Sequence, residues 1–281
     1  MSRRALGIYR EPEFSPGKTD ADAAILDAVL AELAREGFDA VAIEAKKFAA
    51  GTAPPADLIL AMCQGRTALR KLAEAERVSA LAINSALGIR NCYRDLLAAG
   101  LGRAGVPIPP GGLVATTEKL DPRKLPGVDL GAGVFVKRGD LHALGPGDVR
   151  RASDRAEIEA ILNDFARNEV PLAYVQQEEA GRVVKFYGVS GGGYFTALPD
   201  PSRAGSAELS EAAMRALSEA AAAGAKALGL EAWGGDAIVN GERLTIIDFN
   251  DWPSYGRVRD SAARAIARRA MTLLRRRGWS G

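Results

Sequence analysis

Two acidic residues and an asparagine flank a tight turn towards the C-terminal end of the chain. Asp236 begins one apolar run, Asp248 and Asn250 follow a second, and Asn240-Gly241 between the runs is a strong hairpin signal. The hairpin brings Asp236 close to Asp248, and because side chains alternate along a strand, Asp248 and Asn250 share a face. Mg²⁺ prefers such oxygen ligands, completed by phosphate oxygens and water. The spacing therefore predicts a magnesium site, whereas zinc would need Cys or His.

A simpler interpretation needs no metal. Asp248 would cap a turn, and Asn250 would start the Asp-Trp-Pro turn that follows it. That interpretation leaves unexplained why an apolar strand ends in polar residues that converge with Asp236 across the hairpin. We favour the metal site as the hypothesis.

Composition restricts the class of protein. The chain has 281 residues, enough for one large α/β unit or for two to three subdomains around a cleft. Its 37 Lys plus Arg nearly balance 35 Asp plus Glu, so we expect no nucleic-acid partner. The arginines between Arg264 and Arg277 fit a solvated helix face.

The chain carries no signal of export or membrane insertion. Cys63 and Cys92 lack CxxC spacing and suit a reducing compartment. No segment approaches the roughly 20 apolar residues of a membrane span, and the N-terminus has no apolar run of signal-peptide length. We expect a cytoplasmic protein without a membrane partner.

The elements that position the acidic residues fall into three units. Residues 1–110 alternate strands and helices, which predicts a doubly wound α/β domain with a parallel sheet. A segment dense in proline and glycine, residues 105–112, marks its end. Residues 111–190 and 191–281 form α+β units, the second of which carries the metal site. The expected strands are 40–43, 57–62, 81–84, 133–137, 172–176, 183–189, its hairpin partner after the glycine turn 191–193, 236–239 and 244–247. The expected helices are 20–37, one between 62 and 81, one from 91, 154–168, 206–228 and one from 261.

These motifs resemble the ATP-grasp superfamily over nearly the whole chain. Gly-Leu followed by Gly-Asp236, then Ile-Asp248-Phe-Asn250 with Pro253, is similar to the residues that hold two magnesium ions on the ATP phosphates in those enzymes. The resemblance implies ATP and Mg²⁺ as cofactors. It also implies an ATP-grasp fold, in which an N-terminal pre-ATP-grasp domain precedes two α+β subdomains that hold the nucleotide between them.

The same resemblance assigns the nucleotide contacts. Lys137, at the end of Val-Phe-Val-Lys, is similar to the lysine placed against the phosphates. Gln176, Gln177, Glu178 and Glu179 resemble the strand and linker that hold adenine and ribose. Without the resemblance, Lys137 would be a surface lysine and the other four residues an ordinary strand exit.

The loop from Arg138 to Gly147 follows the lysine. It is the natural flap over the β- and γ-phosphates, although it lacks the dense glycine run of many ATP-grasp ligases. His142 is the single histidine of the chain and would face the γ-phosphate or the acceptor. A surface loop histidine is the alternative.

Most enzymes of this architecture are ligases. A carboxylate attacks the γ-phosphate, and an amine or thiol then displaces phosphate from the acyl phosphate, as in ribosomal-protein glutamate ligases and glutathione synthetases. We place this reaction first, and a nucleotide-binding module without activity is disfavoured because Asp236, Asp248, Asn250 and Lys137 are all present. The partners implied are ATP and a small-molecule acceptor, and enzymes of this superfamily are often homo-oligomers.

A kinase is the alternative. Lys185 stands where such ligases usually carry an arginine, and together with Pro199-Asp200-Pro201-Ser202 and the segment 248–257 it is similar to inositol-phosphate kinases of ATP-grasp type. Those enzymes transfer the γ-phosphate to a hydroxyl of a polyol. Lys185, Arg257 and Arg259 would then bind a phosphate or carboxylate of the acceptor, unless they only form surface salt bridges.

Overall fold

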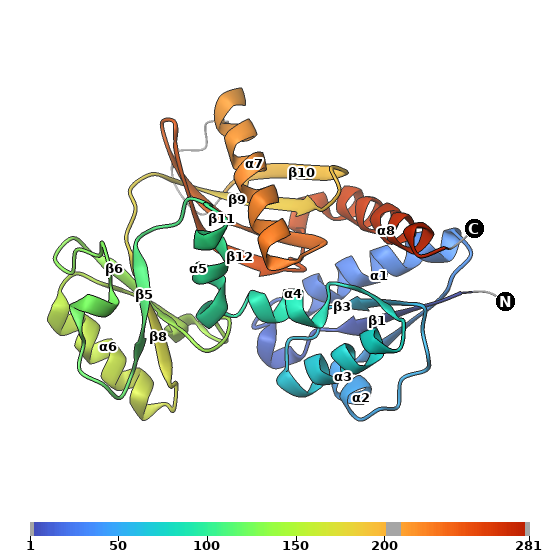
Figure 1. Cartoon of the computed structure of the whole chain (residues 1–281), viewed down its shortest axis with the longest axis horizontal. Coiled ribbons are helices and arrows are strands. Elements are labelled where there is room, and N and C mark those ends of the chain that lie inside the picture. The colour runs from blue at the N-terminus through green and yellow to red at the C-terminus, as the bar shows by residue number, and fades with distance from the viewer. Residues whose placement is uncertain (1–2, 201–208, 279–281) are drawn as a thin grey trace.

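Three four-stranded sheets organise the part of the chain that the structure describes, residues 3–200 and 209–278 (Figure 1). The structure is a computed structural model. Each sheet takes its strands from one stretch of the chain, and helices α4 (Ala86–Asn91) and α5 (Arg94–Arg103) lie between the first stretch and the second. Across the described residues, no helix has both the length and the apolar character that crossing a membrane requires.

The first sheet is parallel and has the strand order β2-β1-β3-β4. Helix α1 covers one face, and α2 and α3 cover the other (Figure 1). This is the doubly wound arrangement that the sequence predicts. Its elements are β1 (Arg4–Tyr9), α1 (Thr19–Arg35), β2 (Asp39–Glu44), α2 (Ala45–Ala49), β3 (Leu58–Ala61), α3 (Arg66–Arg77) and β4 (Leu81–Ile83).

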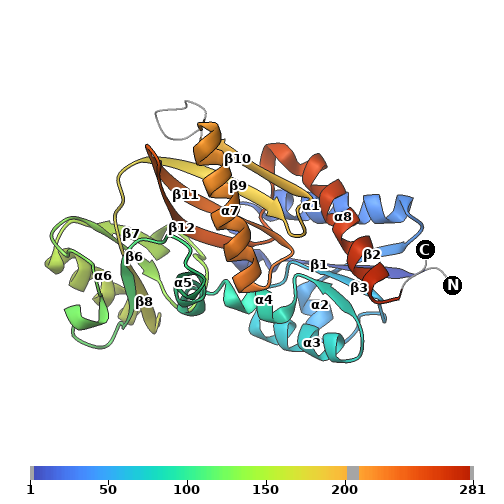
Figure 2. The ribbon, with the colours of Figure 1, turned by 45° about the horizontal axis from the view of Figure 1, so that its top comes forward.

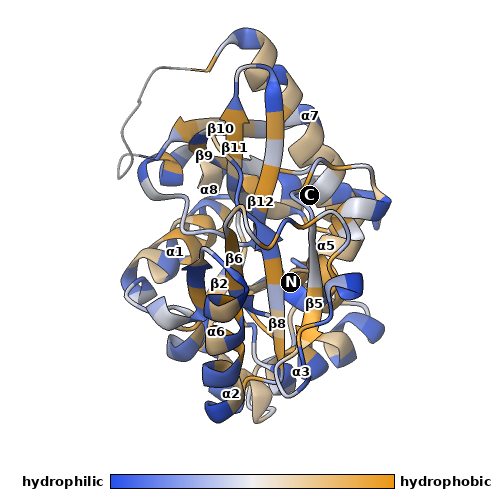
Figure 3. Ribbon diagram, turned by 90° about the vertical axis from the view of Figure 1, so that its left-hand side faces the viewer, coloured by the Kyte–Doolittle hydropathy of each residue, from blue (hydrophilic) through white to orange (hydrophobic). Residues whose placement is uncertain are grey.

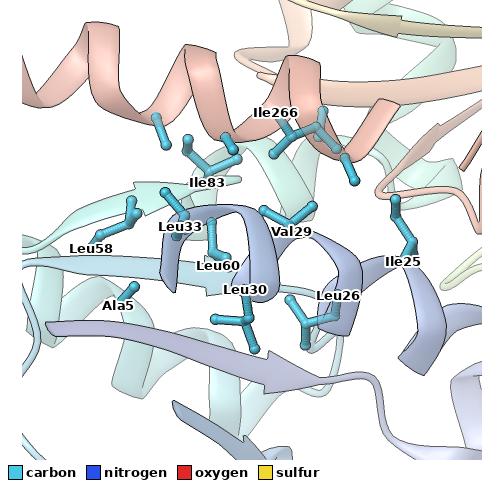
Figure 4. Packing of buried hydrophobic residues seen from close by; sticks show 14 of the residues in the cluster. Ala5, Ile25, Leu26, Val29, Leu30, Leu33, Leu58, Leu60, Ile83 and Ile266 are labelled. Atoms are coloured by element: carbon cyan, nitrogen blue, oxygen red, sulfur yellow. The ribbon is translucent and has the colours of Figure 1, made fainter. Parts of the chain in front are cut away.

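Alternation along the strands supplies a core on each face of this sheet. Leu58 and Leu60 of β3 pack towards α1, whereas Ile59 between them packs with α2 and α3. The C-terminal helix α8 (Arg259–Arg276) lies over α1, so both ends of the chain build the same core (Figure 4).

The second sheet is antiparallel, has the order β5-β8-β6-β7, and packs one face on α6. Its elements are β5 (Gly111–Ala115), β6 (Val134–Arg138), β7 (Val149–Ala152), α6 (Arg155–Arg167) and β8 (Leu172–Gln177). Strands β1, β5 and β7 were not identified from the sequence.

The third sheet is also antiparallel and has the order β10-β9-β11-β12, with α7 packed on it. Its elements are β9 (Arg182–Val189), β10 (Tyr194–Pro199), α7 (Glu211–Leu228), β11 (Ala232–Asn240) and β12 (Arg243–Asp251). The predicted start of the long helix, Ser206, lies outside the described residues, as do Pro201 and Ser202.

Two details of the third sheet differ from the sequence analysis. Strand β9 lies before the predicted boundary at residue 190, yet it pairs with β11, so the change of sheet falls between β8 and β9. Asn240 pairs with Arg243, which makes Gly241 and Glu242 the turn residues. Gly241 has a φ of +60°, the left-handed conformation that such a turn requires and glycine adopts without strain.

The third sheet lies beside the N-terminal domain (Figure 2), and buried side chains join the two. The amide nitrogen of Asn84 donates to the carbonyl of Ala232 at 2.7 Å, and its oxygen accepts from the backbone N–H groups of Glu231 and Ala232 at 2.7 and 2.9 Å. The indole of Trp252 donates to the carbonyl of Ile83 at 3.0 Å. The end of β4 and both ends of the β11–β12 hairpin therefore form one junction.

Candidate active site

The predicted metal ligands lie side by side. Asp236 on β11 is the direct cross-strand partner of Asp248 on β12, and Asn250 pairs with Gly234. The amide of Asn250 lies 3.4 Å from Asp248 Oδ2. Strand β12 changes from an apolar middle to a hydrophilic end at this point (Figure 3). The hairpin thus brings the three residues together as the alternation of strand side chains predicts.

Two cations surround the carboxylate of Asp248. Burial alone would raise its pKa, but Arg94, whose Nη2 lies 3.9 Å away, and Lys137 reverse the effect and lower it. Burial does raise the pKa of Asp236, although Lys185 Nζ lies 3.0 Å from its Oδ1. The site therefore holds one firmly ionised carboxylate beside a second whose charge a neighbouring cation stabilises.

The donor set fits magnesium. Two carboxylates and one amide oxygen are hard oxygen ligands, and Mg²⁺ usually takes one or two protein carboxylates together with phosphate oxygens and water. Among the described residues, no group of three or more His, Cys, Asp or Glu side chains is placed to hold a metal ion. Asn250 is therefore part of the fit, together with oxygens that the substrate would bring.

Lys137 reaches from the second sheet to the metal ligands. Its side chain is buried, and Nζ donates to the carbonyl of Ile247 at 3.0 Å. Burial lowers the pKa of Lys137 from 10.5 to about 8, although the charge of Asp248 acts in the other direction. The lysine therefore lies between the two sheets and next to Asp248, and its contact with phosphate stays a prediction.

The residues predicted to hold adenine divide into two groups. Gln176 is buried and lines, with Tyr174 and Lys137, a small cavity beside Ile247. The side chain of Gln177 instead donates to the carbonyl of Gly133 at 2.8 Å and accepts from a backbone N–H of the same loop.

The acidic pair of the strand exit lies further out. Glu178 forms a salt bridge with Arg151 at 2.7 Å, and Glu179 is half-buried. Of the four strand-exit residues, only Gln176 lines the small cavity beside Lys137. An adenine contact by these residues stays a prediction.

One cavity of about 600 Å³ connects most of the predicted residues with the N-terminal domain. The predicted residues that line it are Lys137, His142, Lys185, Asp236, Asp248 and Asn250. Arg257 is an exception, because it is exposed on a short turn, whereas the nearby Pro253 and Ser254 do line the cavity. All three sheets meet around this space, which is where substrate sites between subdomains occur.

Sequence reasoning missed five polar residues around this cavity. Arg94, with 8% of its side chain exposed, donates to the carbonyl of Arg138 at 2.8 Å. The loop after β1 contributes Arg10, and helix α1 contributes Asp22. The other two are Gln64, which follows β3, and Asp251, the last residue of β12.

Arg10 joins these residues into a cluster. Its guanidinium forms a salt bridge with Asp22 at 3.0 Å and donates to the carbonyls of Trp252 at 2.8 Å and Asp251 at 3.1 Å. Arg10 directly follows β1, and ligands of α/β sheets bind at the carboxyl ends of the strands, but this signal was hidden because β1 itself was not identified from the sequence.

Asp251 and His142 face each other at the floor of the cavity. Asp251 is fully buried, and burial raises its pKa from 3.8 to about 6. His142 Nε2 lies 3.6 Å from Asp251 Oδ1, and burial lowers the pKa of the imidazole from 6.5 to about 4. The predicted surface alternative for His142 is wrong, because only 12% of its side chain is exposed.

The fold matches solved structures, whereas no family model and no curated protein matches the sequence. D-alanine–D-alanine ligase from Bacillus anthracis in complex with ATP has a TM-score of 0.75 at 13% identity, covering 98% of this chain and 100% of that one. A RimK-domain ATP-grasp protein from Sphaerobacter thermophilus has a TM-score of 0.68 at 17% identity, with 95% and 99% covered. D-cycloserine synthetase has a TM-score of 0.66 at 16% identity, with the same coverage. The chain therefore has the ATP-grasp fold that its motifs predict.

Proposed function

We propose that this protein is an ATP-dependent ligase of ATP-grasp type that joins a carboxylate to an amine or thiol and uses Mg²⁺. The observation that carries the proposal is the cross-strand pair Asp236 and Asp248, which lies in one cavity with Lys137 and Lys185. Fixed cations next to paired carboxylates are the arrangement that phosphoryl transfer from a metal-bound nucleotide requires.

The metal would be held by Asp236, Asp248 and Asn250. When bound, it would neutralise the charge that develops on the phosphates of ATP. Lys137 would contact the same phosphates from the second sheet, since its Nζ already lies at the carbonyl of Ile247, one residue before Asp248. The similarity to a ligase structure that contains ATP supports this placement of the nucleotide.

The proposed reaction has two steps. A carboxylate oxygen of the acceptor attacks the γ-phosphorus of ATP, the bond from that phosphorus to the bridging oxygen breaks, and ADP leaves. The amine or thiol of the second substrate then attacks the acyl carbon, the bond to phosphate breaks, and the nucleophile loses a proton. Positioning and charge neutralisation supply most of the rate, so no nucleophilic side chain is needed.

Lys185 is the residue on which the kinase alternative depends. It lines the cavity and forms a salt bridge with Asp236, and it also lies 3.9 Å from Asp200. That pairing places Lys185 at the metal carboxylate, where it would stabilise charge in either reaction. The residue therefore does not favour the kinase, and products decide between the two reactions.

The test measures binding first and products second. Calorimetric titration with ATP should show affinity that depends on Mg²⁺, and no binding would overturn the proposal. A screen of amino acids and polyols then records ADP and inorganic phosphate separately. A ligase releases both in equal amounts only when a carboxylate and an amine or thiol are present, and hydroxylamine should trap the acyl phosphate as a hydroxamate. ADP without free phosphate in the presence of a phosphorylated polyol would establish a kinase instead.

A further inference from the structure

Two polar atoms at the floor of the cavity are buried without a hydrogen-bond partner among the described residues. They are Oδ2 of Asp251 and Nε2 of His142. Both residues line the cavity that contains Asp236 and Asp248. Buried polar groups in proteins are almost always paired, so two unpaired atoms facing one cavity indicate a ligand group that pairs with both.

The two atoms belong to the second and third sheets, and residues of the N-terminal domain hold them in place. Asp251 Oδ1 accepts from the side chain of Gln64 at 2.8 Å, while Oδ2 stays 3.8 Å from Arg10 Nη2, beyond hydrogen-bond range. His142 belongs to the loop between β6 and β7, and its ring packs edge-on against Tyr93 at a centroid distance of 5.9 Å. Both unpaired atoms are therefore fixed before any ligand arrives.

The charges of the cluster favour a cation. Asp22 and Asp251 share a single guanidinium, that of Arg10, which forms a 3.0 Å salt bridge with Asp22. Gln64 is neutral, and so is His142 in its uncharged form. One negative charge is left over next to the unpaired Oδ2.

The number of hydrogens decides between an amine and a hydroxyl. Asp251 Oδ2 is an acceptor, and His142 Nε2 is a second acceptor when the ring proton is on Nδ1. In that tautomer a hydroxyl, which has one hydrogen, satisfies only one of the two atoms; with the proton on Nε2 a hydroxyl would satisfy both, and the titration with the diol distinguishes that case. A primary amine or ammonium group has two or three, so a single nitrogen satisfies both and also matches the charge.

We propose that Asp251 and His142 form the subsite that binds the primary amine of the second substrate. The proposal rests on the ligase function and deepens it, because it assigns the nucleophile to amines rather than thiols. Asp248 and Asn250 line the same cavity as Asp251 and His142, so an amine bound there would share that space with the carboxyl substrate and the nucleotide.

The single histidine of the chain makes this testable without knowledge of the substrate. Nitrogen-15 spectra of the full-length protein with Mg·ADP would follow the His142 imidazole during titration with glycinamide, with N-acetylglycinamide and with propane-1,2-diol. We expect a saturable shift with glycinamide alone. An equal shift with the acetylated compound or the diol, or no shift with any of them, would overturn the proposal.

A variant isolates the carboxylate. Asp251→Asn keeps the side-chain volume and should weaken glycinamide binding about tenfold or more, the effect of removing a charge-assisted hydrogen bond. Asp164→Asn, which removes a half-exposed carboxylate on α6 from its pairs with Arg150 and Arg167, is the matched control and should bind like the wild type. Wild-type affinity in Asp251→Asn would contradict the subsite, and if that variant does not fold, the three probes on the wild type decide.

Calorimetry with Mg·ATP on the same samples separates the two proposals. Nucleotide binding without a glycinamide-dependent shift removes the amine subsite and leaves the ligase proposal intact. A shift without nucleotide binding removes the ligase proposal and leaves an amine site.

Discussion

Lys137 Nζ donates a hydrogen bond of 3.0 Å to the carbonyl of Ile247, the extra residue of a β-bulge in β12. Asp236 pairs with Asp248 and Ala237 with Ile246, so Ile247 is left without a cross-strand partner. Bulges re-aim side chains and free backbone groups next to active sites. Here the bulge gives the lysine of the second sheet a fixed anchor one residue from a predicted metal ligand.

Removing this lysine should weaken nucleotide binding. Lys137→Ala deletes a buried cation next to Asp248, and we expect Mg·ATP affinity to fall by about tenfold to a hundredfold, the usual range for a charge-assisted contact to phosphate. Calorimetric titration measures the affinity of the variant for Mg·ATP. Lys124→Ala, which removes an exposed lysine paired with Glu118, is the control and should not change the affinity. Unchanged affinity in Lys137→Ala would mean that the lysine has only a structural role.

Removing one negative charge from the metal site should abolish turnover without unfolding the protein. Asp248→Asn keeps the volume of the side chain, so its circular dichroism and melting behaviour should stay close to those of the wild type. We expect ATP turnover to fall by about a hundredfold or more, because the site loses its firmly ionised carboxylate. Asp39→Asn, an exposed carboxylate paired with Arg4, should turn over normally. Wild-type turnover in Asp248→Asn would disprove the metal assignment.

The proximity of Asp236, Asp248 and Asn250 was predictable because its cause is local. A glycine turn fixes the hairpin register as far as Ala237 and Ile246, and the bulge at Ile247 then pairs Asp236 with Asp248. Strand β1 was not predictable, because Gly7 interrupts its apolar run. That glycine is explained only by packing, since a Cβ there would lie 2.8 Å from Leu30 of α1.

Asp251 was missed for the opposite reason. It neighbours Asn250 in the sequence, but adjacent strand residues face opposite sides, so the two belong to different surroundings. Its contact with Gln64 spans 187 residues and that with Arg10 spans 241, and no local pattern encodes such distances. Local signals identified the side of β12 that carries Asp248 and Asn250, whereas only the fold identified the contacts of Asp251 with the N-terminal domain.

The buried imidazole should make stability depend on pH below neutrality. The pKa of His142 is about 4 in the folded chain, against the ordinary value of 6.5 in the unfolded chain. Between these two pH values the unfolded chain therefore binds a proton that the folded chain does not. Stability attributable to this group is therefore present above pH 6.5 and is lost as the pH falls towards 4, by about 3 kcal/mol in total.

Urea unfolding of the wild type and of His142→Gln at several pH values measures this term. The difference in unfolding free energy between the two proteins should shrink as the pH falls from 6.5 to 4. Comparing the two proteins cancels the opposite contribution of Asp251, because its raised pKa is common to both. A difference that stays constant over this range would show that the histidine titrates normally.

Asn84 should be one of the most sensitive positions for stability. Its side chain makes three hydrogen bonds to backbone groups of Glu231 and Ala232 at the start of β11, and it is fully buried. Asn84→Ala removes the side-chain acceptor of two buried N–H groups and one of the two hydrogen bonds that the carbonyl of Ala232 accepts. We therefore expect a loss of about 2–4 kcal/mol in the free energy of unfolding. Asn91→Ala is the matched control. Asn91 is half-buried and donates a single hydrogen bond, to the carbonyl of Leu228. This substitution should therefore lower the free energy of unfolding by about 1 kcal/mol or less. Equal losses in the two variants would show that the Asn84 junction does not hold the third sheet on the N-terminal domain.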